Sequence, residues 1–141
     1  MIIKQLSIFL ENKTGRLTEV LSALGEEKID IKAITLADTS AFGILRMLVS
    51  HPDEALSLLR EKGFSVSLTD VLAVSTPVEA GSFARALQLL SSKDIGVEYM
   101  YGFSMGRKAA IILRTEDIDR AVGAIRESDM EILNADALHQ L

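Results

Sequence analysis

The first part of the chain changes from a strand pattern to a helix pattern within a few residues. Apolar and polar side chains alternate from Leu6 to Leu10, which predicts a β-strand over residues 2–11. Over residues 16–27 the apolar positions recur at helical spacing and predict an amphipathic helix. Residues 12–15 therefore form a strand-to-helix turn. A glycine there lets the backbone approach a carboxylate or phosphate, and the first free N–H groups of the helix point at it.

The residues that follow complete one structural unit. Strands are expected at residues 29–36, 42–49 and 64–68, with a polar turn at residues 38–41. Ser50 is expected to cap a second helix, which has Pro52 near its first position. Gly63 stands where the end of a helix favours a left-handed residue. The order of elements is therefore β-α-β-β-α-β.

The chain also aligns with itself when it is shifted by 66 positions, which places Gly15 on Gly81. The matched positions include Leu6 with Leu72, Ile8 with Val74, Leu17 with Phe83, Leu24 with Leu90, Arg60 with Arg126 and Glu61 with Glu127. Any two amphipathic units share such spacing by chance, but the matched glycines and the Arg-Glu pairs favour a duplication.

The repeat predicts an α+β protein made of two ferredoxin-like βαββαβ units, residues 1–69 and residues 70–141. In each unit two helices are expected to cover one face of a four-stranded antiparallel sheet. The boundary near Thr69 and Asp70 has no linker rich in glycine, proline or serine. We therefore expect the two units to be fixed relative to one another.

Composition narrows the classes of function. The 141 residues are 48% hydrophobic, and no apolar run approaches the roughly 20 residues that span a bilayer. A cytoplasmic protein without a membrane segment is the expectation. The net charge of −5 argues against nucleic acid as a partner, because binders of polyanions carry basic patches. With no cysteine and only two separate histidines, we expect no metal site and no cofactor.

Residues Asn12, Lys13, Gly15, Arg16 and Leu17, followed by Ile29-Asp30-Ile31, resemble the signature of ACT domains, which are small amino-acid-sensing regulatory modules. That signature is an Asn-x-Pro-Gly-x-Leu turn, a helix and a Gly-Ile-Asn-Ile-like start of the second strand. Here Thr14 replaces the proline, Asp30 the asparagine and Lys28 the second glycine. The second unit keeps the glycine in Glu79-Ala80-Gly81-Ser82 but has no asparagine or basic residue.

The resemblance implies that the sheets of the two units lie side by side, joined through the edges of their second strands, with a free amino acid at the seam. The turn at residues 12–17 would then face residues 97–101, and the turn at residues 79–82 would face residues 30–34. The candidate ligand-binding residues are Asn12, Lys13, Thr14, Gly15, Arg16, Leu17, Asp30, Ile31, Glu79, Ala80, Gly81, Ser82, Val97, Tyr99 and Tyr101.

Each candidate has a role to test. Backbone N–H groups of residues 15–17 would bind the ligand carboxylate, and Asn12 or Asp30 the ammonium group. Lys13 and Arg16 favour an anion in the first site and Glu79 disfavours one in the second, so we expect one strong site and one weak or empty site.

Structural readings of the same residues stay open. Asn12 suits a helix cap or turn as well as a ligand contact. Tyr99 and Tyr101 alternate on one face of a strand, as in sheet packing. For Gly102 and Gly106, a hairpin turn explains the pattern better than a phosphate loop.

The leading hypothesis is a non-catalytic, amino-acid-binding regulatory protein, expected to be a homodimer and to act on a metabolic enzyme. The alternative is a structural dimerisation module that acts on a partner enzyme without a ligand of its own. An enzyme is the weaker class, because the acids Glu11, Asp30, Asp38 and Asp70 form no evident acid-base pair. RNA binding is also weaker, since the central strands are mostly aliphatic.

Overall fold

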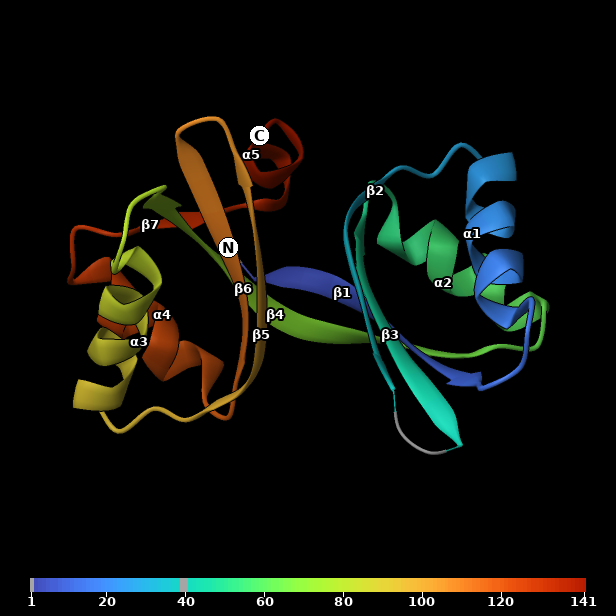
Figure 1. The fold of residues 1–141 in the computed structure, drawn as a ribbon, viewed down its shortest axis with the longest axis horizontal. Helices are drawn as coiled ribbons and strands as arrows, with labels where there is room; N and C mark the ends of the chain where they lie inside the picture. Colours follow the sequence, from blue (N-terminus) through green and yellow to red (C-terminus); the bar gives the residue numbers. More distant parts are fainter. Residues whose placement is uncertain (1, 39–40) are drawn as a thin grey trace. The chain divides into compact units, whose positions relative to one another are not determined.

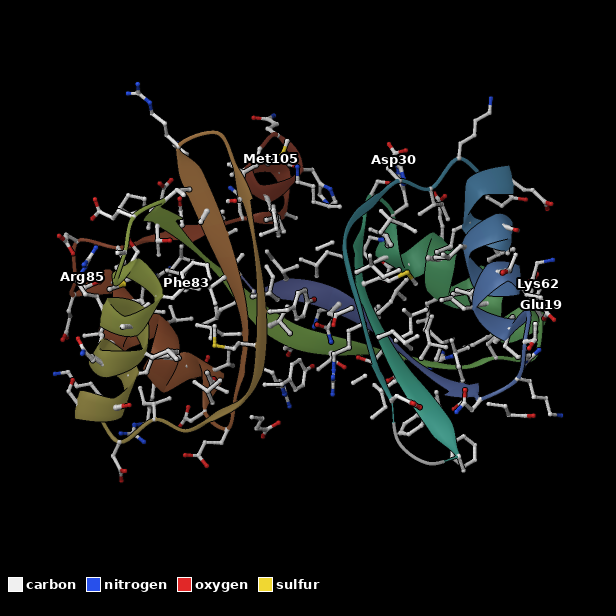
Figure 2. The ribbon with its side chains drawn as sticks, viewed as in Figure 1. Glu19, Asp30, Lys62, Phe83, Arg85 and Met105 are labelled. Atoms are coloured by element: carbon white, nitrogen blue, oxygen red, sulfur yellow. The ribbon has the colours of Figure 1, made fainter. Side chains whose placement is uncertain are left out.

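The computed structural model describes residues 2–38 and 41–141, which form two compact units. Residues Lys4–Thr69 make the N-terminal unit, and Asp70–Leu141, with Ile2 and Ile3, make the C-terminal unit. In chain order the elements are β1 (Ile3–Glu11), α1 (Arg16–Glu26), β2 (Ile31–Asp38), β3 (Phe42–Val49), α2 (Pro52–Glu61), β4 (Ser65–Pro77), α3 (Ser82–Ser92), β5 (Val97–Met105), β6 (Lys108–Thr115), α4 (Ile118–Arg126), β7 (Glu131–Leu133) and α5 (Ala135–His139) (Figure 1). Asp30 lies just before β2, and Met105 ends β5 (Figure 2).

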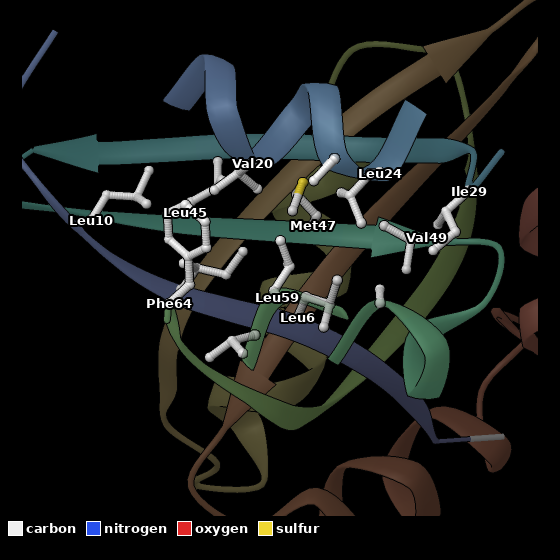
Figure 3. Packing of buried hydrophobic residues seen from close by; sticks show 14 residues of the cluster. Leu6, Leu10, Val20, Leu24, Ile29, Leu45, Met47, Val49, Leu59 and Phe64 are labelled. Atoms are coloured by element: carbon white, nitrogen blue, oxygen red, sulfur yellow. The ribbon is translucent and has the colours of Figure 1, made fainter. Parts of the chain in front are cut away.

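The N-terminal unit has the strand order β2-β3-β1-β4, with α1 and α2 on one face. Its register pairs Ile8 with Leu45, so the alternating apolar side chains of β1 and β3 share the face that the helices cover. The core that results is shown in Figure 3 and consists of Leu6, Ile8, Leu10, Val20, Ala23, Leu24, Ile29, Leu45, Met47, Val49, Ala55, Leu59, Phe64 and Val66. The sequence periodicity is thus explained by burial of one face of each element.

The C-terminal unit repeats this arrangement. Its strand order is β5-β6-β4-β7, and α3 and α4 cover one face. The core consists of Leu72, Val74, Ala86, Leu90, Ile95, Ile111, Leu113, Ala121, Ala124 and Ile125. The 13-residue strand β4 contributes to both units, because their boundary falls inside it. The predicted α+β fold with two ferredoxin-like βαββαβ units is confirmed.

Some sequence predictions about local structure need correction. Ser50 does not cap α2: the cap position is His51, and the Ser50 hydroxyl instead accepts a hydrogen bond from the Asp30 N–H (3.0 Å). Gly102 is not in a turn but inside β5, whereas Gly106, with φ of 61°, does make the hairpin turn.

Two further points concern the first hairpin and membranes. The middle of the polar turn predicted at residues 38–41 lies outside the described residues.

Within the described ranges, the longest helices have 11 residues, and none is long and apolar enough to cross a membrane.

Candidate functional site

The turn before α1 presents the start of a helix as the sequence indicates. Gly15 has φ of 93°, a left-handed conformation that glycine adopts without strain, and no side chain caps the helix. The first intrahelical bond runs from the Glu19 N–H to the Gly15 carbonyl (2.9 Å), and the Arg16 N–H is already donated to Lys13 (3.3 Å). The N–H groups of Leu17 and Thr18 therefore lie ahead of the helical ladder.

The cationic side chains of this turn are paired within the turn itself. The Lys13 ammonium bonds the Glu11 carboxylate at 2.9 Å and holds the pKa of Glu11 below its ordinary value. Arg16 bonds Glu19 at 2.9 Å, and its guanidinium lies 4.5 Å from the centre of the Phe64 ring. Each cation is thus offset by an acid of the same turn.

Asn12 is not a helix cap, because the cap position belongs to Gly15. Its backbone N–H donates to the Ala41 carbonyl (3.2 Å), and its side-chain amide lies 3.5 Å from the Asp38 carboxylate. Asn12 therefore connects the end of β1 with the ends of the β2–β3 hairpin.

A small cavity of about 220 Å³ opens beside this turn. Its lining residues are Leu10, Glu11, Asn12, Lys13, Leu17, Leu36, Asp38 and Gly43. The Leu36 side chain covers Gly43 closely, since a Cβ on Gly43 would come within 3.0 Å of the Leu36 Cδ1. Leu36 therefore fills part of the space that the turn would otherwise leave open.

The turn before α3 has the same backbone geometry. Gly81 has φ of 87°, and the first helical bond runs from Arg85 to Gly81 (2.9 Å). The N–H groups of Phe83 and Ala84 lie ahead of it. The Glu79 carboxylate is held by Arg85 at 2.7 Å, and Arg85 also donates to the Ser82 hydroxyl at 3.1 Å.

A larger cavity of about 500 Å³ lies beside this second turn. Its lining residues are Pro77, Val78, Glu79, Gly81, Ser82, Phe83, Ala84, Gly102, Phe103, Ser104 and Ala109. When the 66-residue shift is applied, every residue that lines the smaller cavity except Leu10 matches a residue that lines the larger one. The duplication therefore extends from the fold to a pair of equivalent cavities.

The predicted site residues fall into two groups: those in or beside the two turns, and those on or next to β2 and β5. Asn12, Lys13 and Leu17 line the first cavity, and Glu79, Gly81 and Ser82 line the second. Thr14, Gly15, Arg16 and Ala80 belong to the two turns.

The remaining candidates lie at the start of β2 or along β5. Asp30 lies just before β2, and Ile31 begins this strand opposite Val49 in the register. Val97 begins β5, and Tyr99 and Tyr101 pair with Arg114 and Ile112. The two tyrosines are half-buried on the sheet face opposite the helices, since the intervening Met100 packs against the core. The pairing of each turn with a strand of the other unit stays a prediction.

Sequence reasoning missed the strand residues that complete the cavities. These are Leu36, Asp38 and Gly43 in the first unit and Gly102, Phe103, Ser104 and Ala109 in the second. The βαββαβ order contains a signal for them. Because β1 and β2 both run antiparallel to β3, their C-terminal ends lie at the same end of the sheet. The turn after β1 must therefore lie beside the hairpin that follows β2.

The described residues hold no group of three or more histidine, cysteine, aspartate or glutamate side chains that could bind a metal ion. The chemistry available at the two turns is therefore that of backbone N–H donors, apolar walls and a few ion-paired side chains. Such an arrangement can bind a small anionic or zwitterionic molecule.

The fold and the paired turns define a tandem protein of two ferredoxin-like units, each with a cavity beside a glycine-led helix. The chain belongs to the ACT domain pair family, which matches residues 1–141. It is similar to protein BT0572 from Bacteroides thetaiotaomicron, with 41% identity over 100% of this chain and 98% of that chain and a TM-score of 0.96.

Its fold is also similar to two regulatory subunits of aspartate kinase. For the ligand-free form from Thermus thermophilus the identity is 20%, the coverage 89% of this chain and 93% of that chain, and the TM-score 0.66. For the subunit from Thermus flavus the corresponding values are 19%, 98% and 92%, and 0.60. A comparison with curated proteins finds no match.

Proposed function

We propose that this chain is a non-catalytic regulatory protein that binds a free amino acid at its strand-to-helix turns. One observation carries the proposal. In each unit a left-handed glycine, the first two free N–H groups of a helix and a cavity lie together at the same end of the sheet. Helix N-termini favour carboxylates through these N–H groups and through the helix dipole. A neighbouring cavity then accepts the rest of a small ligand.

An amino acid also suits the sites by size and affinity. It has about ten heavy atoms, so micromolar binding of about −8 kcal/mol lies within the limit for a ligand of that size. This affinity is sufficient for sensing a metabolite at cellular concentrations.

A regulatory role is favoured over catalysis by the state of the nearby acids. Glu11 and Glu79, which line the two cavities, are held by Lys13 and Arg85 respectively. Lys13 lowers the pKa of Glu11, which makes this carboxylate poorly suited to general base catalysis. The regulatory subunits of aspartate kinase that share the fold support the same role. We propose a metabolic enzyme as the partner and the cytoplasm as the location.

A thermal-shift panel of the twenty amino acids at millimolar concentration tests the proposal. A ligand at a hundred times its dissociation constant adds about 2.7 kcal/mol to the free energy of unfolding. The matched control is the amide of each active amino acid, which lacks the carboxylate and should give no shift. If none of the twenty raises the melting temperature, the proposal is refuted.

A dimerisation module without a ligand is the second candidate, and exposed aromatic residues favour it. Phe9 and Phe42 are 58% and 48% exposed, and both lie on the face of the N-terminal sheet opposite its helices. Covering this face with a second copy would remove apolar surface from water. A dimer by light scattering, together with a silent amino-acid panel, would support this reading over the first.

A further inference from the structure

The linings of the two equivalent cavities differ at three matched positions on the helix and the strands. Phe83 stands where the first unit has Leu17, Gly102 where it has Leu36, and Ala109 where it has Gly43. In the first unit the Leu36 side chain covers Gly43 and occupies the space beside the turn. In the second unit no side chain extends from position 102, and the cavity is about 500 Å³ instead of about 220 Å³.

Close packing keeps Gly102 free of a side chain. A Cβ at this position would lie 3.0 Å from the Phe83 Cε2, 3.1 Å from the Phe83 Cζ and 3.2 Å from the Ala110 carbonyl oxygen. The Phe83 ring therefore lies directly over the backbone of β5, on the side of α3 that faces the strands (Figure 2). The ring and this bare stretch of strand together form an apolar wall of the cavity.

The polarity of the two linings differs as well. The smaller cavity has Glu11, Asn12, Lys13 and Asp38 around it, and the matched residues of the larger cavity are Pro77, Val78, Glu79 and Ser104. Glu79 is the one charged residue among the larger cavity's lining residues, and Arg85 holds its carboxylate at 2.7 Å. The larger cavity is thus mainly apolar.

The volumes of the two cavities also favour the C-terminal unit. Pockets that bind small molecules in proteins usually have volumes of about 300–1,000 Å³. The cavity beside the turn of residues 79–82 falls within this range, and the cavity beside the turn of residues 12–17 falls below it. Volume thus favours the C-terminal unit, whereas the charges of Lys13 and Arg16 favour the N-terminal unit in the sequence.

We propose that the cavity of the C-terminal unit is the selective site, and that it binds an amino acid with an apolar side chain. The ligand's carboxylate accepts hydrogen bonds from the N–H groups of Phe83 and Ala84, and its side chain enters the cavity against the Phe83 ring. Gly102 and Phe83 determine which side chains fit. This inference rests on the proposed function and names the class of ligand and the unit that selects it.

Burying a side chain the size of leucine or valine should make binding roughly tenfold to a hundredfold tighter than that of glycine. Isothermal titration of the full chain with glycine, valine, leucine, phenylalanine, serine, aspartate and lysine measures this order directly. We expect valine, leucine or phenylalanine to bind most tightly.

The matched variants Ala84→Leu and Thr18→Leu identify the unit. Both residues are exposed on the first turn of a helix and occupy equivalent positions of the repeat, but Ala84 lines the larger cavity. Ala84→Leu should weaken the tightest binding at least about tenfold, because its side chain occupies the cavity of the C-terminal unit, while Thr18→Leu alters only the turn of the other unit and should leave the affinity of this tightest site unchanged. Melting temperatures without ligand report that both variants are folded.

Phe83→Leu supplies a second test that does not fill the cavity. It replaces the ring with leucine, the residue that the first unit has at position 17. Because leucine is smaller than phenylalanine, the preference should shift toward larger, aromatic ligands. If a polar or charged amino acid binds tightest, or if Thr18→Leu abolishes binding while Ala84→Leu retains it, the inference is overturned. If no amino acid binds the unmodified protein, the proposed function fails with it. Undiminished affinity of Ala84→Leu for the preferred amino acid defeats this inference alone.

Discussion

Gly102→Ala tests whether the contact between the Phe83 ring and β5 exists in solution. The new Cβ would lie 3.0 Å from the ring and 3.2 Å from the Ala110 carbonyl oxygen. The carbonyl belongs to β6, whose backbone is fixed by pairing on both sides, so the ring must move. Phe83 is 38% exposed and can swing outward, at the loss of its contacts with the strand.

The change in the free energy of unfolding caused by Gly102→Ala is the sum of two opposing effects. Overpacking of this kind destabilises by about 1–3 kcal/mol, and replacing glycine by alanine restores about 0.4–1 kcal/mol through the entropy of the unfolded chain. We therefore expect Gly102→Ala to lower the free energy of unfolding by about 1 kcal/mol. That corresponds to a fall in melting temperature of roughly 3–4 °C for a protein of this size.

Gly43→Ala is the matched control. Its Cβ would meet the end of the flexible Leu36 side chain at 3.0 Å, and the nearest backbone atom, the Ala37 carbonyl oxygen, is 3.7 Å away. Leu36 is 48% exposed and can change rotamer, so this variant should be neutral within about 0.5 kcal/mol. Urea unfolding of both variants, of Phe83→Ala and of Gly102→Ala combined with Phe83→Ala measures the coupling between ring and strand. The reasoning is refuted if Gly102→Ala is as stable as the unmodified protein, or if removing the ring does not reduce its effect.

Three further outcomes are expected. A Cβ at position 15 would meet no atom within 4 Å, but Gly15→Val forces valine to adopt φ of 93°, so it should destabilise by about 1–2 kcal/mol and abolish any response of that turn to ligand before the fold is lost; a variant that unfolds outright would limit the glycine to a turn role. Lys13→Ala removes the cation that lowers the pKa of Glu11, so that pKa should rise toward its ordinary value in a carboxyl NMR titration; an unchanged value would mean that the ion pair is absent in solution. Phe9→Asp places a charge on the exposed sheet face, and light scattering should then report a monomer if two copies meet there, whereas an intact dimer would exclude that face.

Local patterns in the sequence determined most of the fold. Alternation at residues 6, 8 and 10 and helical spacing from residue 17 each identify one buried face, and β1 and α1 follow almost to the residue. The repeat then predicts the second unit, including the glycine at its helix start, which the structure shows to be left-handed. These predictions succeed because strand and helix patterns and left-handed turns depend on neighbours within about four positions.

The tertiary structure decided what surrounds the two turns. Leu36 and Gly102 occupy the same place in the repeat, yet their consequences appear only when the second strand is brought beside the turn. The Leu36 side chain lies over Gly43 in the smaller cavity, and the bare backbone of Gly102 lies under the Phe83 ring in the larger one. The positive charges of Lys13 and Arg16, which favour an anion at the first turn in the sequence, are paired with the carboxylates of Glu11 and Glu19 in the structure. Such pairing depends on side-chain rotamers and distances. Volume and electrostatic pairing depend on segments that are far apart in the chain. The sequence by itself therefore determined the two turns, and only packing decided which of them has room beside it for a ligand.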